Sequence, residues 1–325
     1  MAIAVQSPFN TNPAYSGTFI PTIWSGKLNA KFYATTVFGE IANTNYEGDI
    51  KNIGDKVVIN NIPSVTINDY TVGNTLSYEV PAPNKIELDI SKAKYFGVNV
   101  SDVLEYQSQP KLMDMFTNDA AKQMAINIDT DLLKNSMDTV AAKNRGTTAG
   151  VRSGSFNLGG AGTGAATDAG ALLSLSTSNI VSTITSMASV LDEQNVPDTD
   201  RFLVISPAVR NLLMGSNLQQ AYLTGDSQSI LRNGKIGTID RFTIYVSNLL
   251  PTAAADKNFD GTTNTGATAR KCIVAGHTTA ISFASQIAKV ESLQNPNDFG
   301  TLVRGLNIYG YKTIKPESLV IAQYA

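Results

Sequence analysis

The chain has 325 residues, of which 42% are hydrophobic and 16% are charged, and its formal net charge is -2 at pH 7. An average soluble domain carries roughly 25% charged residues, so much of this surface must be neutral polar or apolar, which suits burial against partners. The small net charge excludes a strongly basic nucleic-acid-binding protein and a polybasic membrane-surface module.

The sequence contains one cysteine, Cys272, and one histidine, His277. These counts exclude an internal disulfide and an ordinary zinc site built from cysteine and histidine ligands. No stretch approaches the roughly 20 apolar residues that a membrane helix needs. The N-terminus also lacks a basic flank followed by an apolar run. We therefore expect a soluble protein that is made in the cytoplasm.

Residues 1–30 are rich in Asn, Ser, Thr, Gly and Pro, and their apolar residues follow no period. Such a segment cannot bury large apolar side chains by itself. The composition predicts an extended arm that is disordered or lies on another surface, for which another subunit is a candidate.

An alternating apolar pattern begins at Asp55 and predicts two strands of a long ribbon. The apolar positions are Val57 and Ile59 in one strand and Ile86, Leu88 and Ile90 in the other. Turn signals lie between the strands, at Val72-Gly73-Asn74, Pro81 and Pro83. A free two-stranded hairpin is marginally stable in water. We expect this hairpin to project from the body and to lie against a neighbouring molecule.

A long helix is predicted to begin at Pro110, where the missing N–H costs nothing. Apolar residues then recur at every fourth position, namely Leu112, Phe116, Ala120, Met124, Ile128 and Leu132, with Met115, Leu133 and Met137 beside them. A helix that continues to Lys143 is about 50 Å long at about 1.5 Å per residue. The stretch 144–177 is rich in Gly, Ala, Ser and Thr without a period, and it predicts a long loop.

The stretch 190–213, VLDEQNVPDTDRFLVISPAVRNLL, predicts a helix, a stop, a buried strand and a second helix. The first helix has Ser178 as its candidate N-cap and the apolar side Ile180, Ile184, Met187 and Leu191. Asn195 is expected to take a left-handed conformation at the end of this helix, and Pro197 prevents continuation. We expect Pro197 and the strand Phe202–Ile205 to lie in a core.

The second helix is predicted from Ser206 as N-cap and Pro207 as first helical residue to Gly215, which ends it. Residues 242–246 then alternate as a strand, and strand-like stretches follow as KCIVAG, AISFA and GTLVRGLNIYGYKTI. The order of ribbon, long helix, α/β unit and strands predicts two compact domains. The second is inserted before the chain returns to the first.

The sequence resembles the major capsid proteins of tailed phages, which have the Hong Kong ninety-seven (Johnson) fold. The resemblance covers nearly the whole chain and depends on the order of its motifs. These are FIPTIWSGKL, YEGDIKNIGDKVVINNIPSVTINDYT, DISKAKYFGVNVSDV, LDEQNVPDTDRFLVISP, IYVSNLLP and AGHTTAISFASQIAKVESLQNPNDFGTLVRGLNIYGYKTIKPESLVIA. No motif among them is a catalytic signature.

The resemblance implies an α+β phage capsid fold with an N-terminal arm, an extended β-hairpin E-loop, a P-domain with a long spine helix, and an α/β A-domain. The implied ranges are the arm 1–30, the P-domain start 31–54, the E-loop hairpin 55–96, the P-domain 97–175 with spine helix 108–143, the A-domain 176–275, and the return to P-domain strands 276–325.

The resemblance also implies partners. Subunits of this kind form pentamers and hexamers of an icosahedral shell that encloses double-stranded DNA, and the protein is then a virion capsid component assembled in the host cytoplasm. Because FIPTIWSGKL follows almost at once after Met1, a separate scaffolding protein is expected rather than a fused one. A portal and a decoration or cement protein are further partners of such shells. Contact with DNA is expected to be non-specific.

A calcium-like loop is the sharpest local motif. Asp256, Asn258 and Asp260, followed by Gly261, match the start of a calcium-binding loop, and Thr262 would add its carbonyl oxygen. Position twelve is Ala267 instead of the bidentate Glu, which weakens any such site. A polar surface turn is the favoured interpretation, and no other cofactor is predicted.

Catalytic interpretations are weaker than structural ones at every other candidate. A hydrolase would need His277 as base, but a structural or surface histidine is favoured. The glycines of LGGAGTGAATDAG lack the Lys-Ser/Thr end of a phosphate loop, so a linker is favoured. Asp192 and Glu193 are adjacent on a helix and cannot converge on one bond, so a solvated helix face is favoured.

Covalent joining of a Lys and an Asn between subunits occurs in some capsids of this fold. Lys51, Lys56 and Lys85 lie near the E-loop, but nothing in the sequence selects a pair. We therefore predict a self-assembling structural subunit that is not an enzyme. The alternative is an α/β enzyme or a nucleotide- or carbohydrate-binding protein built on residues 180–246.

Overall fold

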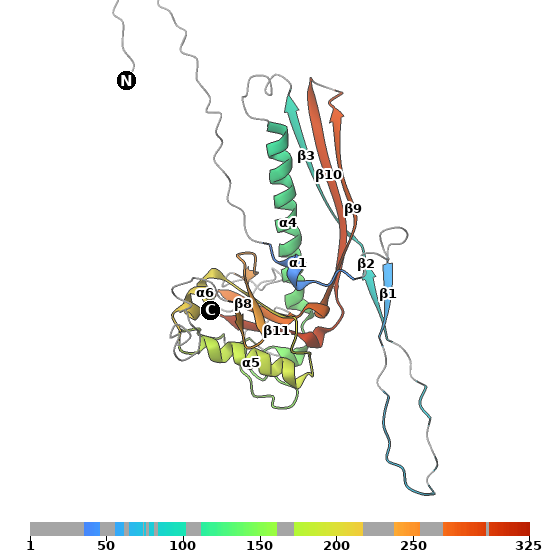
Figure 1. Ribbon diagram of the computed structural model, residues 1–325, viewed down its shortest axis with the longest axis vertical. Coiled ribbons are helices and arrows are strands. Elements are labelled where there is room, and N and C mark those ends of the chain that lie inside the picture. Colours follow the sequence, from blue (N-terminus) through green and yellow to red (C-terminus); the bar gives the residue numbers. More distant parts are fainter. Residues whose placement is uncertain are drawn as a thin grey trace, which may run out of the picture.

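The computed structural model describes residues 36–45, 56–61, 65–73, 75, 78–80, 84–101, 112–160, 172–216, 237–253, 269–296 and 299–325. In these ranges the protein is a mixed α+β fold, as the sequence predicts (Figure 1). The predicted arm 1–30 and the calcium-like loop lie outside the described residues.

The helices are α1 (Phe38–Ile41), α4 (Leu112–Thr139), α5 (Ile180–Glu193) and α6 (Pro207–Met214), with short 3-10 turns η1 (Ala142–Asn144), η3 (Thr278–Ala280) and η4 (Pro316–Ser318). The strands are β1 (Lys56–Asn61), β2 (Asn84–Asp89), β3 (Lys92–Ser101), β4 (Arg201–Ile205), β5 (Thr238–Ile239), β6 (Phe242–Val246), β7 (Thr252–Ala253), β8 (Arg270–His277), β9 (Ile281–Gln294), β10 (Gly300–Thr313) and β11 (Leu319–Tyr324).

The largest sheet has the strand order β11-β8-β4-β6-β5, with β7 paired to β8. Strand β4 lies in its interior, parallel to β6 and antiparallel to β8, and all five of its residues are buried. Successive side chains of a strand point to opposite faces. Phe202 and Val204 accordingly belong to one apolar core, whereas Leu203 and Ile205 belong to another. The predicted central strand is confirmed.

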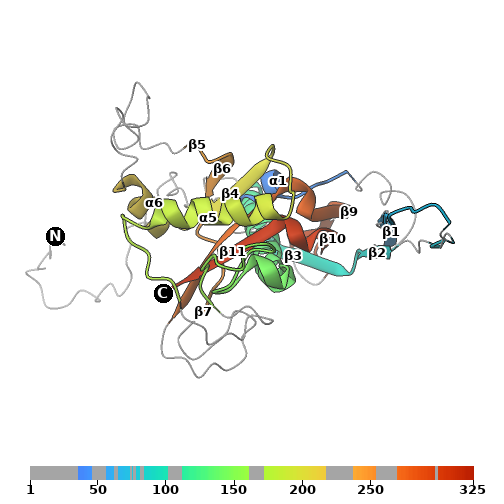
Figure 2. The same cartoon turned by 90° about the horizontal axis from the view of Figure 1, so that it is seen from below.

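Two cores therefore sandwich this sheet. Helices α5 and α6 cover one face, and α5 lies across the strands as seen from below (Figure 2). The other face packs against α1 and the C-terminal part of α4, through Ile41, Leu132 and Leu133. Because one sheet contributes to both cores, the α/β unit and the long helix are joined by continuous packing rather than by a flexible linker.

The second sheet is antiparallel and has the strand order β3-β10-β9. Helix α4 runs along β3 and β10 (Figure 1). Asp131 of α4 accepts a hydrogen bond from the Tyr309 hydroxyl of β10 at 2.9 Å and lies 3.4 Å from the Lys94 ammonium of β3. Polar contacts thus fasten the middle of the helix to both strands.

Helix α4 differs from the predicted spine helix at its C-terminal end. It ends at Thr139 rather than at Lys143, because the following Val140 is buried and the Ala141 N–H pairs with the carbonyl of Pro316. The predicted start at Pro110 lies outside the described residues. Of the predicted apolar stripe, Ile128, Leu132 and Leu133 are buried, but Met115 and Phe116 are exposed. Only the C-terminal half of the helix enters the core.

The last strand lies in a different sheet from the two strands before it. Residues 276–325 were predicted to return to the strands of the P-domain. Strands β9 and β10 belong to the second sheet, but β11 pairs with β8 in the larger sheet, with Ile321 opposite Val274. An almost entirely apolar strand such as LVIAQY needs cover on both faces, which the two cores of the larger sheet supply. The division into arm, E-loop, P-domain and A-domain stays a prediction.

Local capping signals were confirmed at three positions and wrong at one. Asn195 is left-handed with φ 57, Ser206 accepts the N–H of Val209 as the N-cap of α6, and Gly215 ends that helix. At α5, however, Asn179 rather than Ser178 occupies the N-cap position, and its side chain bonds Ser176 and Ser174 instead of the helix. The strand Phe202–Ile205 is buried as expected, but Pro197 is exposed.

Candidate assembly surface

The hairpin predicted from Asp55 is anchored at its base. Strands β1 and β2 pair antiparallel with Ile59 opposite Ile86 and Val57 opposite Leu88. Ile59 and Leu88 are buried against Ala284 and Ile314 of the body, in a small core of their own. The alternation that predicted the ribbon is confirmed, and it directs one apolar face of the hairpin base onto β9 and the end of β10.

Beyond this base the ribbon leaves the body. The loop 65–80 extends away from both sheets (Figure 1), and it is described at residues 65–73, 75 and 78–80. The predicted turn is present at Val72 and Gly73, where Gly73 has a φ of +98°. The two arms of the loop are tied by a hydrogen bond from the Thr66 N–H to Glu79 at 3.2 Å. Hydrogen bonds from the side chain and from the main-chain N–H of Thr66 lower the pKa of Glu79.

The described side chains of this loop are exposed, including its large apolar ones. They are Val65 at 62% exposure, Ile67 at 89%, Tyr70 at 67%, Val72 at 94%, Tyr78 at 86% and Val80 at 94%. Full burial of such a side chain contributes roughly 1.5–3 kcal/mol. A contiguous set of exposed apolar residues marks an interaction surface. The loop 65–80 is therefore a candidate binding surface, whose apolar side chains are left uncovered by the described residues of the chain.

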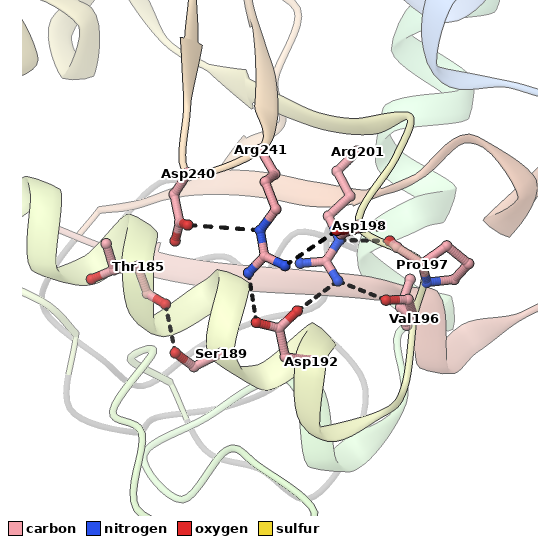
Figure 3. Close-up of polar contacts among 9 residues, drawn as sticks. All are labelled: Thr185, Ser189, Asp192, Val196, Pro197, Asp198, Arg201, Asp240 and Arg241. Carbon is pink, nitrogen blue, oxygen red and sulfur yellow. Dashed lines mark hydrogen bonds and ion pairs between the residues drawn. The ribbon is translucent and has the colours of Figure 1, made fainter.

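The opposite extreme is the wedge, which we define as α5, β4 and α6 (residues 180–214). Its stop between α5 and β4 is organised by Arg201, whose side chain is fully buried. The Arg201 guanidinium donates to the carbonyls of Val196 and Pro197 and to the Asp192 carboxylate, at 2.7, 2.8 and 2.7 Å. Figure 3 shows Arg201 and Arg241 converging on Asp192 from two sides.

Asp192 thus links two arginines. Burial alone would raise its pKa, but hydrogen bonds from Arg201 and Arg241 hold the pKa of Asp192 below its ordinary value. Arg241 comes from the two-residue turn between β5 and β6, and it also lies 3.9 Å from Asp198. The network joins the C-terminal end of α5, the start of β4 and the β5–β6 turn into one rigid corner.

Glu193 is fixed separately. Its carboxylate accepts the N–H groups of Arg152 and Ser153 at 2.9 and 3.2 Å, which lowers the pKa of Glu193. Asp192 and Glu193 therefore point to different partners. They do not converge on one bond. Asp192 lies on an exposed face of the helix, as expected, and both carboxylates also hold neighbouring segments in place. The sequence of an acidic pair does not show which groups its carboxylates bind when those groups come from distant parts of the chain.

Asn144 is a further residue that the sequence did not single out. It is fully buried, donates to the carbonyls of Glu317 and Leu319 at 2.6 and 2.8 Å, and accepts from Gln194 at 2.8 Å. It therefore connects the segment after α4, the end of α5 and the start of β11. A lone Asn in a Gly- and Ser-rich stretch carries no signal for such a role.

The residues considered as candidates for catalysis, crosslinking or metal binding make structural contacts or lie outside the described ranges. His277 accepts the Thr279 N–H as the N-cap of η3, and burial lowers its pKa. Lys56 pairs with Glu87 and Asp89 of its own hairpin at 3.3 and 3.4 Å. The described residues contain no group of three or more side chains that could hold a metal. Asp256, Asn258, Asp260 and Thr262 are outside them, so the calcium-like loop stays a prediction.

Membrane insertion through a helix finds no support in the described residues. None of the helices there is both long and apolar enough to span a bilayer.

The arrangement defines a class of protein. A stiff wedge, a long helix beside a β-ribbon, and a projecting apolar loop together describe a subunit that binds copies of itself or similar partners through extended surfaces. Cys272, the single cysteine, is buried, and burial raises the pKa of its thiol far above its ordinary value. It offers no reactive group that would suggest otherwise.

The chain belongs to the phage capsid protein family, whose sequence pattern matches residues 85–322. It is accordingly a major capsid protein, a structural subunit of a tailed-phage icosahedral shell. This agrees with the resemblance found in the sequence, and the family match gives no support to the alternative of an α/β enzyme on residues 180–246. No curated protein matches the sequence.

Solved structures support the same fold. A chain from Mycobacterium phage Che8 is similar over 95% of this chain and 98% of that chain, with a TM-score of 0.72 and 26% identity. The capsid of the cyanophage P-SCSP1u has a TM-score of 0.68 at 15% identity, covering 98% and 99% of the two chains. The mature capsid of bacteriophage PhiM1 has a TM-score of 0.65 at 15% identity, covering 99% of each.

Proposed function

We propose that this subunit assembles into pentamers and hexamers in which the loop 65–80 of each copy lies on a neighbour, and that these capsomers close into a shell around double-stranded phage DNA. The observation that supports this most directly is the exposure of six large apolar side chains on that loop. No apolar surface of its own chain covers them within the described residues, so a neighbour is the partner that a repeated assembly supplies.

Assembly also explains why the loop does not need to be stable alone. A two-stranded ribbon without a covering layer is marginal in water. A neighbour that supplies the missing face stabilises the bound form by mass action. Subunit binding and ordering of the loop are therefore one thermodynamic event, and the strength of the shell depends on a segment that contributes little to the folded monomer.

The wedge has the complementary role. Subunits that meet around a symmetry axis must keep their angles fixed, and the corner formed by Asp192, Arg201 and Arg241 fixes the position of α5 relative to β4. We propose that the A-domain, predicted as residues 176–275, faces the capsomer axis. A purely structural role without catalysis fits the use of Asp192, Glu193 and His277 as intramolecular anchors.

The remaining partners follow from the family. The small net charge of -2 favours DNA that is held by confinement, without tight phosphate binding. A separate scaffolding protein, a portal and a decoration or cement protein are proposed as further partners of shells of this type. Assembly is proposed to take place in the host cytoplasm.

An assembly experiment with loop variants tests the proposal. We expect Ile67→Ser combined with Val72→Ser to fold normally but to stay as small oligomers, because it removes two of the most exposed apolar side chains of the loop. The measurements are negative-stain microscopy and sedimentation velocity of the purified chain under conditions in which the wild type forms capsomers or shells.

Val151→Ser is the matched control. Val151 is also an exposed apolar residue, at 50%, but it lies in the turn after η1. This variant should assemble like the wild type. Equal assembly of the loop double variant and the wild type would overturn the proposed role of the loop, and a wild-type chain that forms only discrete small oligomers with no shells or capsomers would weaken the shell proposal itself.

A further inference from the structure

One buried carboxylate, Asp129 of α4, has no role in the features described so far. Its side chain is fully buried, and its Oδ2 accepts the N–H of Val37 at 2.9 Å across a separation of 92 residues. The N–H of Phe38 is a second donor to the same carboxylate. Oδ1 has no hydrogen-bond partner in the described part of the chain.

These donors are the first N–H groups of the short helix α1. Val37 occupies the N-cap position but provides no side-chain cap. The free N–H groups at a helix start need an acceptor, and Asp129 supplies it from another helix. Residues 36–45 form the described segment that connects the N-terminal 35 residues to the body. Asp129 therefore holds the first described residues that follow the predicted arm.

The surroundings of Asp129 are apolar. Ile128, Leu132 and Leu133 of α4 and Val37 and Ile41 of the α1 segment are all buried in one core. An ionised carboxylate in such a place loses much of its hydration, and two N–H donors replace only part of it. The site therefore favours the neutral form of the carboxyl group.

The other ionisable groups on the elements that form this core have partners of their own. Glu40 of α1 accepts from the Tyr245 hydroxyl of β6. Asp131 of α4 is paired with Lys94 of β3 and with the Tyr309 hydroxyl of β10. Cys272 of β8 donates to the carbonyl of Pro251. None of the cations in the described ranges forms an ion pair with Asp129. Burial consequently raises its pKa to about 6, partly offset by the N–H groups of Val37 and Phe38.

We propose that Asp129 is a proton-sensitive latch for residues 36–45, which holds α1 on α4 when its carboxyl group is neutral and lets the segment detach more readily when the group is ionised. Detachment would expose the carboxylate to water and free the base of the N-terminal arm. The latch thus makes the position of the arm respond to pH without any change elsewhere in the fold, and the inference stands on the subunit alone, whatever shell it forms.

The direction and size of the effect follow from linkage. The closed form has the raised pKa of about 6, so it binds the proton more tightly than the open form, in which the pKa returns to about 4. Closure is most stable below about pH 4 and weakens as the pH rises towards 6. From well below pH 4 to well above pH 6 the opening equilibrium increases by about a hundredfold in total, and between pH 4 and pH 6.5 it increases by about fortyfold.

Other contacts determine the opening equilibrium at low pH, from which this increase starts. Asn43 pairs with β9 through hydrogen bonds to Ile281 and Phe283, at 2.8 and 2.9 Å, and the rings of Phe38 and Phe283 lie 5.5 Å apart. These contacts contain no group that titrates between pH 4 and 7. They keep the segment attached on average, so opening is a minor population whose size the carboxyl group adjusts.

Hydrogen exchange of the unassembled full chain tests the latch. After correction for the intrinsic exchange rates, peptides that cover residues 36–45 should show opening that increases by about fortyfold between pH 4 and pH 6.5. Peptides from α5 serve as an internal reference for global stability. Asp129→Asn should abolish this pH dependence, because its amide oxygen still accepts the Val37 N–H but does not titrate.

Asp131→Asn is the matched control, two residues along the same helix and partly exposed, and it should keep the wild-type dependence. Opening of residues 36–45 that is independent of pH in the wild type, or a dependence that persists in Asp129→Asn, would overturn the proposal. If Asp129→Asn fails to fold, carbon NMR titration of the Asp129 carboxyl in the wild type decides. A midpoint near pH 6 supports the latch, and one near pH 4 contradicts it.

Discussion

The wedge and the projecting loop of the same chain are opposite solutions to burying apolar side chains. In the wedge, every residue of β4 is buried and the two faces of the strand enter separate cores. In the ribbon, Ile59 and Leu88 at the base are buried, whereas Ile67 and Val72 near the tip are 89% and 94% exposed. The wedge finds its apolar partners within the chain, whereas the described residues of the chain leave the apolar side chains of the loop uncovered.

Charges follow the same division. Asp192 of the wedge accepts hydrogen bonds from Arg201, also of the wedge, and from Arg241 of the β5–β6 turn, and Arg201 bonds main-chain carbonyls as well. Between residues 62 and 83 the sequence has two charged residues, Asp69 and Glu79. Fixed ionic contacts rigidify a part that must keep its shape, and few charges lower the desolvation cost of a part that becomes buried on assembly.

The largest loss of stability is expected from a cavity in the central strand of the wedge. Leu203→Ala should destabilise the unassembled subunit by about 2–5 kcal/mol, because a fully buried side chain is removed beneath α5. Urea unfolding monitored by circular dichroism measures this change. Leu203→Met keeps the volume and should cost less than about 1.5 kcal/mol. Equal losses for both variants would show that packing volume does not control this strand.

The next effect concerns the corner. Asp192→Asn should cost about 1.5–3 kcal/mol, because it weakens a hydrogen bond to the charged and fully buried Arg201. Since the pKa of Asp192 is lowered, its contribution is present above about pH 4 and is lost as the pH falls below that value. Thermal unfolding between pH 3 and pH 7 measures both the loss of stability in Asp192→Asn and the pH dependence of the wild type.

Asp198→Asn provides the comparison for the corner. Asp198 is 66% exposed and lies 3.9 Å from Arg241, so its replacement should change stability by less than about 0.5 kcal/mol. A loss at Asp198 as large as that at Asp192 would mean that the corner depends on the total charge around Arg241 and not on the buried bond to Arg201.

The contrast also explains what the sequence could predict. Local signals were reliable where the chain bonds to itself nearby, as at Ser206, whose hydroxyl accepts the N–H of Val209, and at Asn195. The cap at Ser178 was wrong because the neighbouring Asn179 uses its side chain for a turn with Ser174 and Ser176. Two adjacent polar residues compete for one position, and composition does not decide between them.

Contacts between distant segments could not be predicted from the sequence. Asp129 meets Val37, Asn144 meets Leu319, and β11 pairs with β8, each across long separations. The apolar run of β11 indicates a strand that is buried on both faces, but periodicity does not show which strand it pairs with. The family motifs predicted the architecture well because they preserve the order of elements along the chain, but single buried polar contacts leave no period in the sequence.

A smaller effect is expected at the turn between β5 and β6. Asp240 and Arg241 form a two-residue hairpin loop with φ values of 45° and 67°, a conformation that favours Gly at the second position. Arg241→Ala loses the ion pairs and keeps the backbone strain, whereas Arg241→Gly loses the same ion pairs and removes the strain. The Gly variant should be more stable than the Ala variant by about 1 kcal/mol, as measured by urea unfolding.

The smallest effect on the isolated subunit belongs to the loop. Ile67→Ala should change the unfolding free energy of the unassembled chain by less than about 0.5 kcal/mol, because the side chain is 89% exposed and has little apolar contact to lose. The same change should weaken assembled particles, because we propose that a neighbour covers this residue there. A loss above about 1 kcal/mol in the free subunit would mean that the loop already packs against its own chain in solution. The difference between wedge and loop would then lie in their geometry and not in where their stabilising partners come from.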